Sequence, residues 1–340
     1  MSSPALSVVM PAYNEARHLP ATIDALIEAV DRSGFDAELV VVDDGSADGS
    51  GDVARDAASG RIPVRVLRQE NSGRLAARRA GIEAAEASLV LLLDGRVRIE
   101  ADALRFLRRM VQAGQLVWTS HVHVVGDSSY GTFWGLIAEL AWREYFDHPR
   151  TTTFGIDQFD HFPKGTTCFV APRHILLEAF DHFESRYADT RHANDDTPVL
   201  RNIAARCGIG VSPRFACTYA PRENLSAFVR HSVHRGVVFL DGHGRLESRF
   251  FPAVVVFFPL SAAIAFAALK RPLVVPAAAA LCSGVAAGLG ARARRNRHEV
   301  RALALVTPIY AFAHGVGMWK GLVFLAASRL ARRDRAAPAS

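Results

Sequence analysis

The sequence predicts an α/β fold with a doubly wound, mostly parallel sheet, followed by transmembrane helices. Short apolar runs alternate with helical patterns over residues 6–98, an order typical of parallel strands joined by crossover helices. After residue 249 the composition changes, and two adjacent stretches of twenty residues carry no charge. Each stretch is long enough to cross a hydrocarbon core of about 30 Å.

Four strands are expected in the first part of the chain. They cover residues 6–10, 38–42, 64–67 and 89–93. The last of these is wholly apolar, which is typical of a central strand buried on both faces. Apolar spacing predicts a helix from Leu19 to Val30, and an Ala-rich stretch predicts another over residues 72–87. Asp48 or Ser50 is expected to cap the intervening helix.

The second part, from residue 116 to 249, has a more mixed pattern. Residues 118–125 alternate as a half-buried strand does, and residues 126–165 predict loops with one helix near 133–146. A strand is expected to end at residue 171 and a helix to cover 172–180. The run Asp195-Asp196-Thr197-Pro198 predicts another helix start, since acids and proline favour the first turn.

Charge is distributed unevenly along the chain. The net charge is +6, yet residues 250–340 hold twelve Lys and Arg against only Glu299 and Asp334. These basic residues flank apolar runs, which indicates a membrane surface and not a nucleic-acid partner. Buried core helices are the alternative for the apolar runs, but adjacent uncharged twenty-residue runs flanked by arginines are unusual in soluble domains.

Positive charge also favours one membrane topology. Two crossings would place residues 292–301 on the cytoplasmic side, as the positive-inside rule requires. A third crossing would place Arg329, Arg332, Arg333 and Arg335 outside. We therefore expect two spans and a third apolar segment that is re-entrant or lies in the interface.

Acidic residues follow two of the predicted strands. Asp43 and Asp44 end the second strand, and Asp94-Gly95-Arg96 ends the buried fourth strand. Ligands of open α/β sheets bind just beyond the carboxyl ends of the strands. Two adjacent carboxylates can accept hydrogen bonds from a base or a ribose but repel a phosphate, so this turn favours the nucleoside end of a nucleotide. A solvated turn is the alternative for Asp43 and Asp44 taken alone.

Four segments in series resemble the family 2 glycosyltransferases of GT-A fold, of the membrane-associated bacterial type. They are Ser7-Val-Val-Met-Pro-Ala-Tyr-Asn-Glu15, Val41-Val-Asp-Asp-Gly-Ser46, Asn71-Ser-Gly-Arg-Leu-Ala-Ala-Arg-Arg-Ala-Gly81 and Leu91-Leu-Leu-Asp-Gly-Arg96. The resemblance covers about the first 110 residues and continues less firmly to about residue 240. Asp195-Asp196 stands where the family has a Glu-Asp pair.

The resemblance implies a role for each matching residue. Asp43 would bind the base with Asp44 beside it, and Asp196 would be the general base, paired with Asp195. A helix cap is the alternative for Asp195 and Asp196 taken alone. The remaining substrate-binding positions implied are Pro11, Tyr13, Asn14, Glu15, Asn71, Arg78, Asp94 and Gly95.

The sequence departs from the family at one position. Arg96 stands where the last acid of Asp-x-Asp would hold a divalent metal. Asp94 alone is a poor protein site for Mg²⁺ or Mn²⁺, whereas an arginine fork can bind a diphosphate directly. We therefore expect reduced or absent metal dependence, with Arg96 as a catalytic residue. A surface pair between Arg96 and Glu100 is the alternative.

Together these features predict an inverting glycosyltransferase of the inner membrane with its catalytic domain in the cytoplasm. Its partners would be a nucleotide-diphospho-sugar, a lipid-linked or envelope glycan acceptor and the membrane. The rival interpretation is a membrane-bound nucleotide-sugar binding protein without catalysis. A dinucleotide-dependent oxidoreductase is excluded because G-x-G-x-x-G does not follow the first strand. The processive Gln-x-x-Arg-Trp signature is also absent, which favours transfer of a single sugar.

These predictions divide the chain into three regions. A glycosyltransferase domain is expected over residues 1–249, with a nucleotide-binding half at 1–115 and an acceptor and catalytic half at 116–249. A membrane region is expected over 250–328, followed by a basic tail over 329–340. The expected membrane segments lie at residues 250–269, 272–291 and 302–327.

Overall fold

The computed structural model describes residues 4–336, and the chain divides into two compact units. The first comprises Met1–His123, Trp142–Glu184 and Asp195–Ala220, and the second comprises Val124–Ala141, Ser185–Asn194 and Pro221–Ser340. The units are interleaved in sequence, unlike the division at residue 249 expected from hydropathy. Contacts group residues 221–249 with the apolar helices because α9 packs along α12. The domain boundaries themselves stay a prediction.

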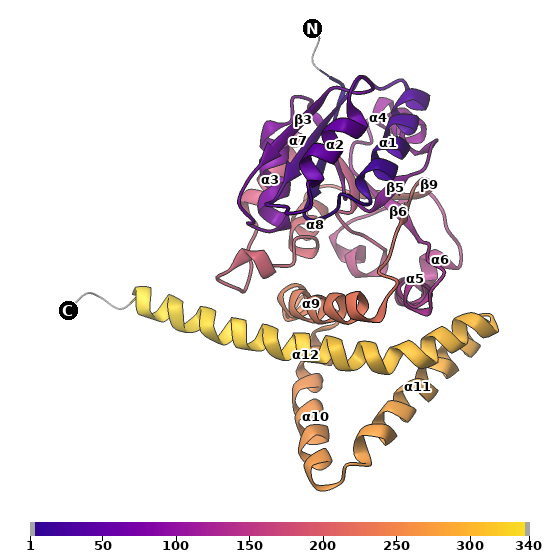
Figure 1. Ribbon diagram of the computed structural model, residues 1–340, viewed down its shortest axis with the longest axis vertical. Helices are drawn as coiled ribbons and strands as arrows, with labels where there is room; N and C mark the ends of the chain where they lie inside the picture. The colour runs from indigo at the N-terminus through magenta and orange to yellow at the C-terminus, as the bar shows by residue number, and fades with distance from the viewer. Residues whose placement is uncertain (1–3, 337–340) are drawn as a thin grey trace. The chain divides into compact units, whose positions relative to one another are not determined.

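The first unit is built on one mixed sheet (Figure 1). Within the described residues its strand order is β3-β2-β1-β4-β8-β6-β9-β5, and β7 pairs with β9. The strands are β1 Leu6–Ala12, β2 Ala37–Asp43, β3 Val64–Arg68, β4 Leu89–Leu93, β5 Val97–Ile99, β6 Trp118–Val124, β7 Thr152–Phe154, β8 Cys168–Pro172 and β9 Ile209–Tyr219.

The strands β3, β2, β1 and β4 form a parallel half, as expected. The first β1–β2 partners are Leu6 and Ala37, and the last are Ala12 and Asp43, so both strands end at the same edge. The other half is antiparallel and begins where β8 pairs with β4. Parallel strands with crossover helices confirm the predicted α/β class.

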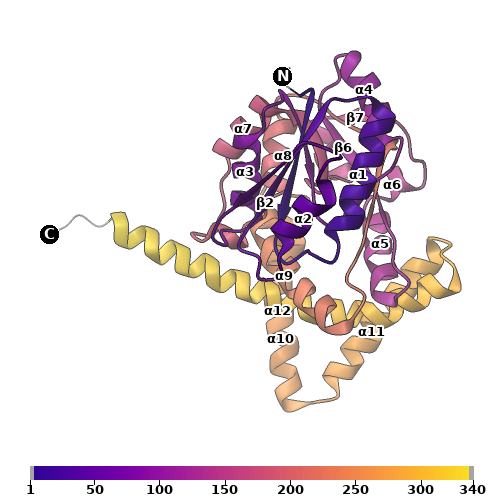
Figure 2. The ribbon, with the colours of Figure 1, turned by 45° about the horizontal axis from the view of Figure 1, so that its top comes forward.

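Helices cover both faces of this sheet (Figures 1 and 2). They are α1 Leu19–Ser33, α2 Ser50–Ala58, α3 Arg74–Ala84, α4 Ala103–Gln112, α6 Arg143–Phe146, α7 Arg173–Asp181 and α8 Thr197–Ala204. One core packs Leu26 and Phe106 against one face of the sheet, and a second packs Ile82 and Val199 against the other. A Cβ on Gly81 would lie 2.3 Å from a Val9 methyl, so glycine lets α3 approach β1 closely.

Several element boundaries differ from those predicted. The helix expected over 72–87 is shorter, and the cap of α2 is Gly49 at φ 78°, not Asp48 or Ser50. Asp48 instead accepts hydrogen bonds from the backbone N–H and hydroxyl of Ser50. The helix expected near 133–146 is divided into α5 Ser129–Ala141 and α6. Strands β5, β7 and β9 had no clear periodic signal.

The second unit is helical. It contains α5, α9 Leu225–His243, α10 Phe251–Lys270, α11 Val274–Arg292 and α12 Arg297–Ala336. Helices α10 and α11 form a hairpin, and α12 runs across its open end (Figure 1). By length and composition, the apolar parts of α10, α11 and α12 could each cross a membrane. Most of the expected basic tail continues α12, and residues 337–340 lie outside the described part of the chain.

Candidate functional site

The loops after β1 and β2 are tied to each other. The Asn14 amide N–H donates to Ser46 Oγ at 3.0 Å, and Asn14 Oδ1 accepts from the Ala47 N–H at 2.9 Å. Asn14 adopts φ 54°, which asparagine tolerates better than most residues. The Glu15 N–H donates to Ser50 Oγ at 2.8 Å. These bonds fix the two predicted nucleotide-binding loops together, while Tyr13 remains half exposed.

Asp43 and Asp44 are both buried, so a solvated turn is the wrong description of them. Asp43 Oδ1 accepts from the Ser46 N–H at 2.9 Å. Asp44 accepts from the Ser72 and Gly73 N–H groups at 2.9 Å each, and from the Gln69 amide at 2.7 Å. Asp44 therefore holds the turn that leads into α3.

Close backbone packing joins that turn to the Asp43-Asp44 loop. A Cβ on Gly45 would lie 2.9 Å from the Asn71 amide nitrogen, and Gly45 has φ 78°. Only glycine combines this backbone conformation with so close an approach. Asn71 is nevertheless an exposed residue. The segment that carries Asn71 thus lies directly against the predicted nucleoside site.

Arg78 brings three of the predicted site carboxylates together. It projects from α3, is fully buried, and lies 2.7 Å from Asp94 and 3.5 Å from Asp196. Its other contact is a short ion pair with Asp195. Arg74, one turn earlier on α3, lies 3.4 Å from Asp195. Two guanidinium groups therefore face three carboxylates from two distant segments of the chain, one holding Asp94 and the other Asp195 and Asp196.

The charges in this cluster shift the two aspartate pKa values in opposite directions. Burial pushes the pKa of Asp196 upward, but Arg78 and Arg74, with hydrogen bonds from Thr166, outweigh burial and hold it below its usual value. For Asp195 burial prevails over the same two arginines, so its pKa is raised. Burial lowers the pKa of Arg78, but the three carboxylates outweigh it and raise that pKa.

Asp196 is the accessible carboxylate of the pair. Its side chain is 29% exposed, against 5% for Asp195. It occupies the N-cap position of α8, yet its side chain makes no capping hydrogen bond. It accepts instead from the Thr166 N–H at 3.2 Å and from the Thr166 hydroxyl. The helix-cap alternative therefore describes its position in the backbone but not the use of its carboxylate.

Arg96 is paired with Glu15. The two side chains lie 2.8 Å apart, and Glu100, the alternative partner, lies 3.6 Å from His123. The Gly95 carbonyl accepts a hydrogen bond from the Thr22 hydroxyl at 2.9 Å, which fixes the turn before Arg96. The predicted contact between Arg96 and a diphosphate stays a prediction.

The residues present do not fit a dedicated protein metal site. Asp94 is engaged by Arg78 at 2.7 Å and accepts from the Thr167 hydroxyl at 3.3 Å. Within residues 4–336, no group of three or more His, Cys, Asp or Glu side chains is arranged to hold a metal ion. The Arg78 guanidinium already compensates the negative charge of Asp94, the one carboxylate that the family motif would offer to a metal.

The sequence profile described as glycosyl transferase family 2 matches residues 7–171. This stretch is a glycosyl transferase family 2 domain. The match runs from β1 to β8, so the family 2 domain includes Arg78, Asp94 and Arg96. It ends before Asp195 and Asp196, which reach the cluster from outside the matched stretch.

Curated relatives match part of the same domain. An undecaprenyl-phosphate 4-deoxy-4-formamido-L-arabinose transferase of Aeromonas hydrophila is 38% identical over 117 residues, which cover 34% of this chain and 36% of that protein. An uncharacterized glycosyltransferase of Bacillus subtilis, EpsJ, is 31% identical over 113 residues, covering 33% of this chain and 32% of that protein. The chain thus spans about a third of the length of these relatives.

A solved structure shares the fold. It is a mannosyltransferase from Pyrobaculum calidifontis in complex with GDP-Man and Mn²⁺, with a TM-score of 0.52 and 17% identity. The likeness covers 97% of this chain and 88% of that one. Together with the strand order, it shows that the family 2 domain has the GT-A type of fold expected from the sequence.

Two residues of the cluster, Thr166 and Arg74, were not among the predicted site residues. Thr166 precedes β8 in a loop, and nothing in its neighbours marks it as a partner of Asp196. Arg74 lies one helical turn before Arg78, so its position on the same face of α3 was the only available indication. Their partners come from distant segments, and local periodicity contains no information about such contacts.

Proposed function

We propose that the chain is a membrane-anchored glycosyltransferase that transfers one sugar, with inversion, from a nucleotide-diphospho-sugar to a lipid-linked or envelope glycan acceptor. The observation that carries this proposal is the cluster in which buried Arg78 holds Asp94, Asp195 and the partly exposed Asp196. Arg78 and Asp94 belong to the family 2 domain, whose loops after β1 and β2 are fixed together. These features support a nucleotide pocket with an ionised carboxylate beside it.

The proposed donor contacts follow the ends of β1, β2 and β4. Asp43 binds the base with Asp44 supporting its loop, and Pro11, Tyr13, Asn14 and Glu15 line the pocket. Asn71, Arg78, Asp94 and Gly95 border the ribose and diphosphate. The fixed loops support this proposal because a pre-organised pocket loses less entropy when it binds a ligand.

The proposed chemical step uses Asp196 as general base. Its carboxylate takes the proton of an acceptor hydroxyl, the hydroxyl oxygen forms a bond to the anomeric carbon, and the bond from that carbon to the diphosphate oxygen breaks. The nucleoside diphosphate leaves with the bonding electron pair. Arg96 would exchange Glu15 for the diphosphate and stabilise its developing charge.

The charge state of the acceptor decides whether this base is needed. A hydroxyl must lose its proton, whereas a phosphate monoester is already ionised near neutral pH. The Aeromonas relative is named for transfer to undecaprenyl phosphate, which supports a lipid-linked acceptor here. The proton acceptor of our scheme is needed when the attacking group is a hydroxyl on such a lipid-linked glycan.

Turnover of radiolabelled sugar nucleotides in membranes containing the chain tests the proposed function. A thermal-shift screen over sugar nucleotides selects the donor, and transfer of label to a lipid or glycan fraction is the expected result. Stabilisation by a sugar nucleotide without any transfer or hydrolysis would instead support the non-catalytic binding protein. The arginine at position 96 is the feature that favours this second candidate.

Metal removal is expected to lower the activity by less than tenfold. Asp94 is already compensated by Arg78, and a divalent ion would have to be held mainly by substrate phosphates and water. Initial rates with and without a strong chelator measure this effect.

Replacing Arg96 by alanine should instead lower kcat by about 10²-fold, in the range found for loss of one transition-state charge contact.

Arg98→Ala is the matched control, because Arg98 is an exposed arginine two residues further along. Its variant should keep the rate of the unaltered chain. Complete loss of activity in chelator, restored by Mn²⁺, would show that a metal and not Arg96 neutralises the diphosphate.

A further inference from the structure

Helix α12 has two different faces along its length. Small and apolar side chains on one face are buried within the second unit. They include Ala302, Leu303, Val306, Ala313 and Met318. The opposite face exposes a continuous apolar stripe of five residues at helical spacing. This outer stripe consists of Leu305, Phe312, Val316, Trp319 and Val323. A helix that crosses a bilayer as a separate span has no reason to maintain such a division.

The buried face of α12 lies against a helix that carries charge. Gly236 of α9 meets the middle of α12, where an added Cβ would lie 2.1 Å from the His314 carbonyl oxygen. Arg230 and Arg235 are exposed residues of α9 that precede Gly236 along the same helix. If the middle of α12 lay at the centre of a bilayer, these arginines would lie in hydrocarbon, which is costly.

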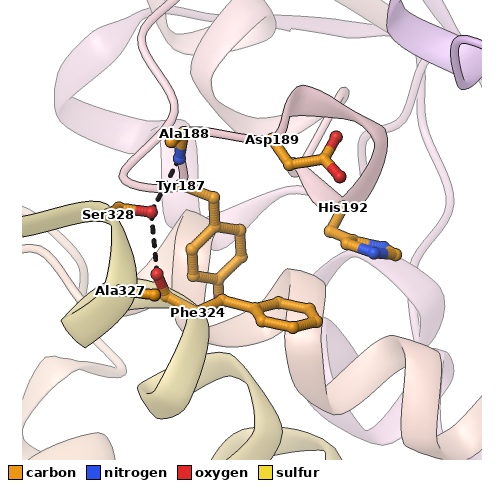
Figure 3. Close-up of a pocket in the computed structure, with 7 residues that line it drawn as sticks. All are labelled: Tyr187, Ala188, Asp189, His192, Phe324, Ala327 and Ser328. Carbon is orange, nitrogen blue, oxygen red and sulfur yellow. Dashed lines mark hydrogen bonds between the residues drawn. The ribbon is translucent and has the colours of Figure 1, made fainter. Parts of the chain in front are cut away.

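The largely non-helical residues 185–194 cover the C-terminal part of α12, around Phe324 and Ser328. The Ala188 N–H donates to Ser328 Oγ at 2.8 Å, and the His192 ring stacks on Phe324 with centroids 4.9 Å apart (Figure 3). A cavity of about 310 Å³ lies between this segment and the helix, with Asp189 on its wall. Non-helical backbone is not tolerated where lipid surrounds it, so this part of α12 also lies outside the hydrocarbon core of the membrane.

The start of α12 has a polar partner from the same unit. Arg295, two residues before the helix, forms an ion pair with Glu139 of α5 at 2.6 Å. The beginning, the middle and the C-terminal part of α12 therefore each contact charged or irregular protein segments. Helices α5 and α9 and residues 185–194, which carry these charged or irregular groups, lie against α12 along its length.

The outer stripe faces the side from which the apolar hairpin extends. Trp319 Nε1 donates to Ser261 Oγ at 3.1 Å, and its ring meets Phe258 of α10. The start of α12 meets the last turns of α11, where Leu303 lies against Gly290. Helix α12 thus bridges the open end of the α10–α11 hairpin, as Figure 1 shows, and its stripe continues the apolar surface of that hairpin.

We infer that α12 lies in the plane of a membrane and does not cross it. Its outer stripe enters the hydrocarbon boundary of an anionic lipid leaflet, and the α10–α11 hairpin alone extends into the bilayer. Charge complementarity favours an anionic surface, because Arg292, Arg294, Arg295 and Arg297 gather at the open end of the hairpin and Arg329 is exposed further along α12. This inference is independent of the proposed sugar transfer.

Spin labels at single cysteines test this orientation in vesicles that contain phosphatidylglycerol. After the four native cysteines are replaced by serine, labels are placed at positions 305, 312, 316 and 323, with position 302 as the buried control. Relative accessibility to oxygen and to a water-soluble nickel complex gives the depth of each label. We expect one shallow depth for all stripe positions, and depths that increase along α10 from position 256 to 264.

Two outcomes would overturn the inference. A depth that rises to a maximum near position 312 and falls toward both ends would show a helix that spans the bilayer. Spin–spin coupling between copies at the stripe positions would show that a second chain covers the stripe. Reporter domains fused after residue 340 provide a test that leaves the native cysteines unchanged. A fluorescent cytoplasmic reporter should be active there, and an active periplasmic phosphatase would contradict the inference.

Discussion

Replacing Asp196 by asparagine should lower kcat by about 10²–10⁴-fold, the usual contribution of a positioned general base. Asparagine keeps the shape of the side chain and its contact with Thr166 but cannot accept the acceptor's proton. Asp196 suits this role because it is the exposed member of its pair and is held ionised by Arg78 and Arg74, against the effect of burial. Initial rates with the donor selected by the binding screen measure the effect.

The control for this substitution is Asp181→Asn. Asp181 is an exposed acid of the same unit that pairs with Arg79 on the surface, so its loss should leave the rate within about twofold because exposed pairs contribute little. Donor affinity should be unchanged in both variants. A fall of less than tenfold in Asp196→Asn, with unchanged donor binding, would contradict the base role and indicate an acceptor that is already ionised, such as a lipid phosphate.

Replacing Arg78 by methionine should have the largest effect on stability. Methionine fills a similar volume but leaves Asp94, Asp195 and Asp196 without their shared cation. Loss of one partner from a buried ion pair costs about 3–5 kcal/mol, which corresponds to a fall in Tm of roughly 10 °C for a domain of this size. Thermal unfolding of the purified chain in detergent measures it. Arg79→Met removes a neighbouring arginine whose pairs are exposed, and should cost about 1 kcal/mol or less.

Arg78→Lys separates the effect on activity from the effect on stability. Lysine restores one positive charge but cannot contact three carboxylates as a planar guanidinium does. Weaker attraction leaves the effect of burial on Asp196 less opposed, so its pKa should rise. Because the deprotonated form is the base, the acidic limb of the kcat/KM profile should move to higher pH. An unchanged acidic limb in a folded Arg78→Lys variant would show that Arg78 does not set the charge state of Asp196.

Much of the fold follows from local sequence patterns. The parallel half was predictable because short apolar runs alternate with helical patterns, and because β4 is apolar throughout. A strand that is buried on both faces can be predicted from its composition, because all its residues are apolar. The antiparallel half was less predictable, since β7 and β5 have only three residues each and draw their stability from pairing with β9.

The site was predictable as a set of residues but not as an arrangement. The motif positions Asp43, Asp94 and Arg78 were identified from their places after strands and on a helix. The partner of Arg96 was not, because Glu15 reaches it across 81 positions in the chain. The hydrogen bonds from the turn before α3 to the Asp44 carboxylate were not predictable either, because they join residues 28 and 29 positions apart.

Local periodicity and composition were sufficient to predict the parallel α/β layout, the acidic turns after β2 and β4 and the three apolar segments. Tertiary structure decided that Arg78 is the common cation of Asp94, Asp195 and Asp196, and that α12 has a covered and an uncovered face. Both features depend on contacts between segments that are distant in the sequence. Such contacts determine the burial and the electrostatic interactions of each side chain, and local sequence patterns contain no information about them.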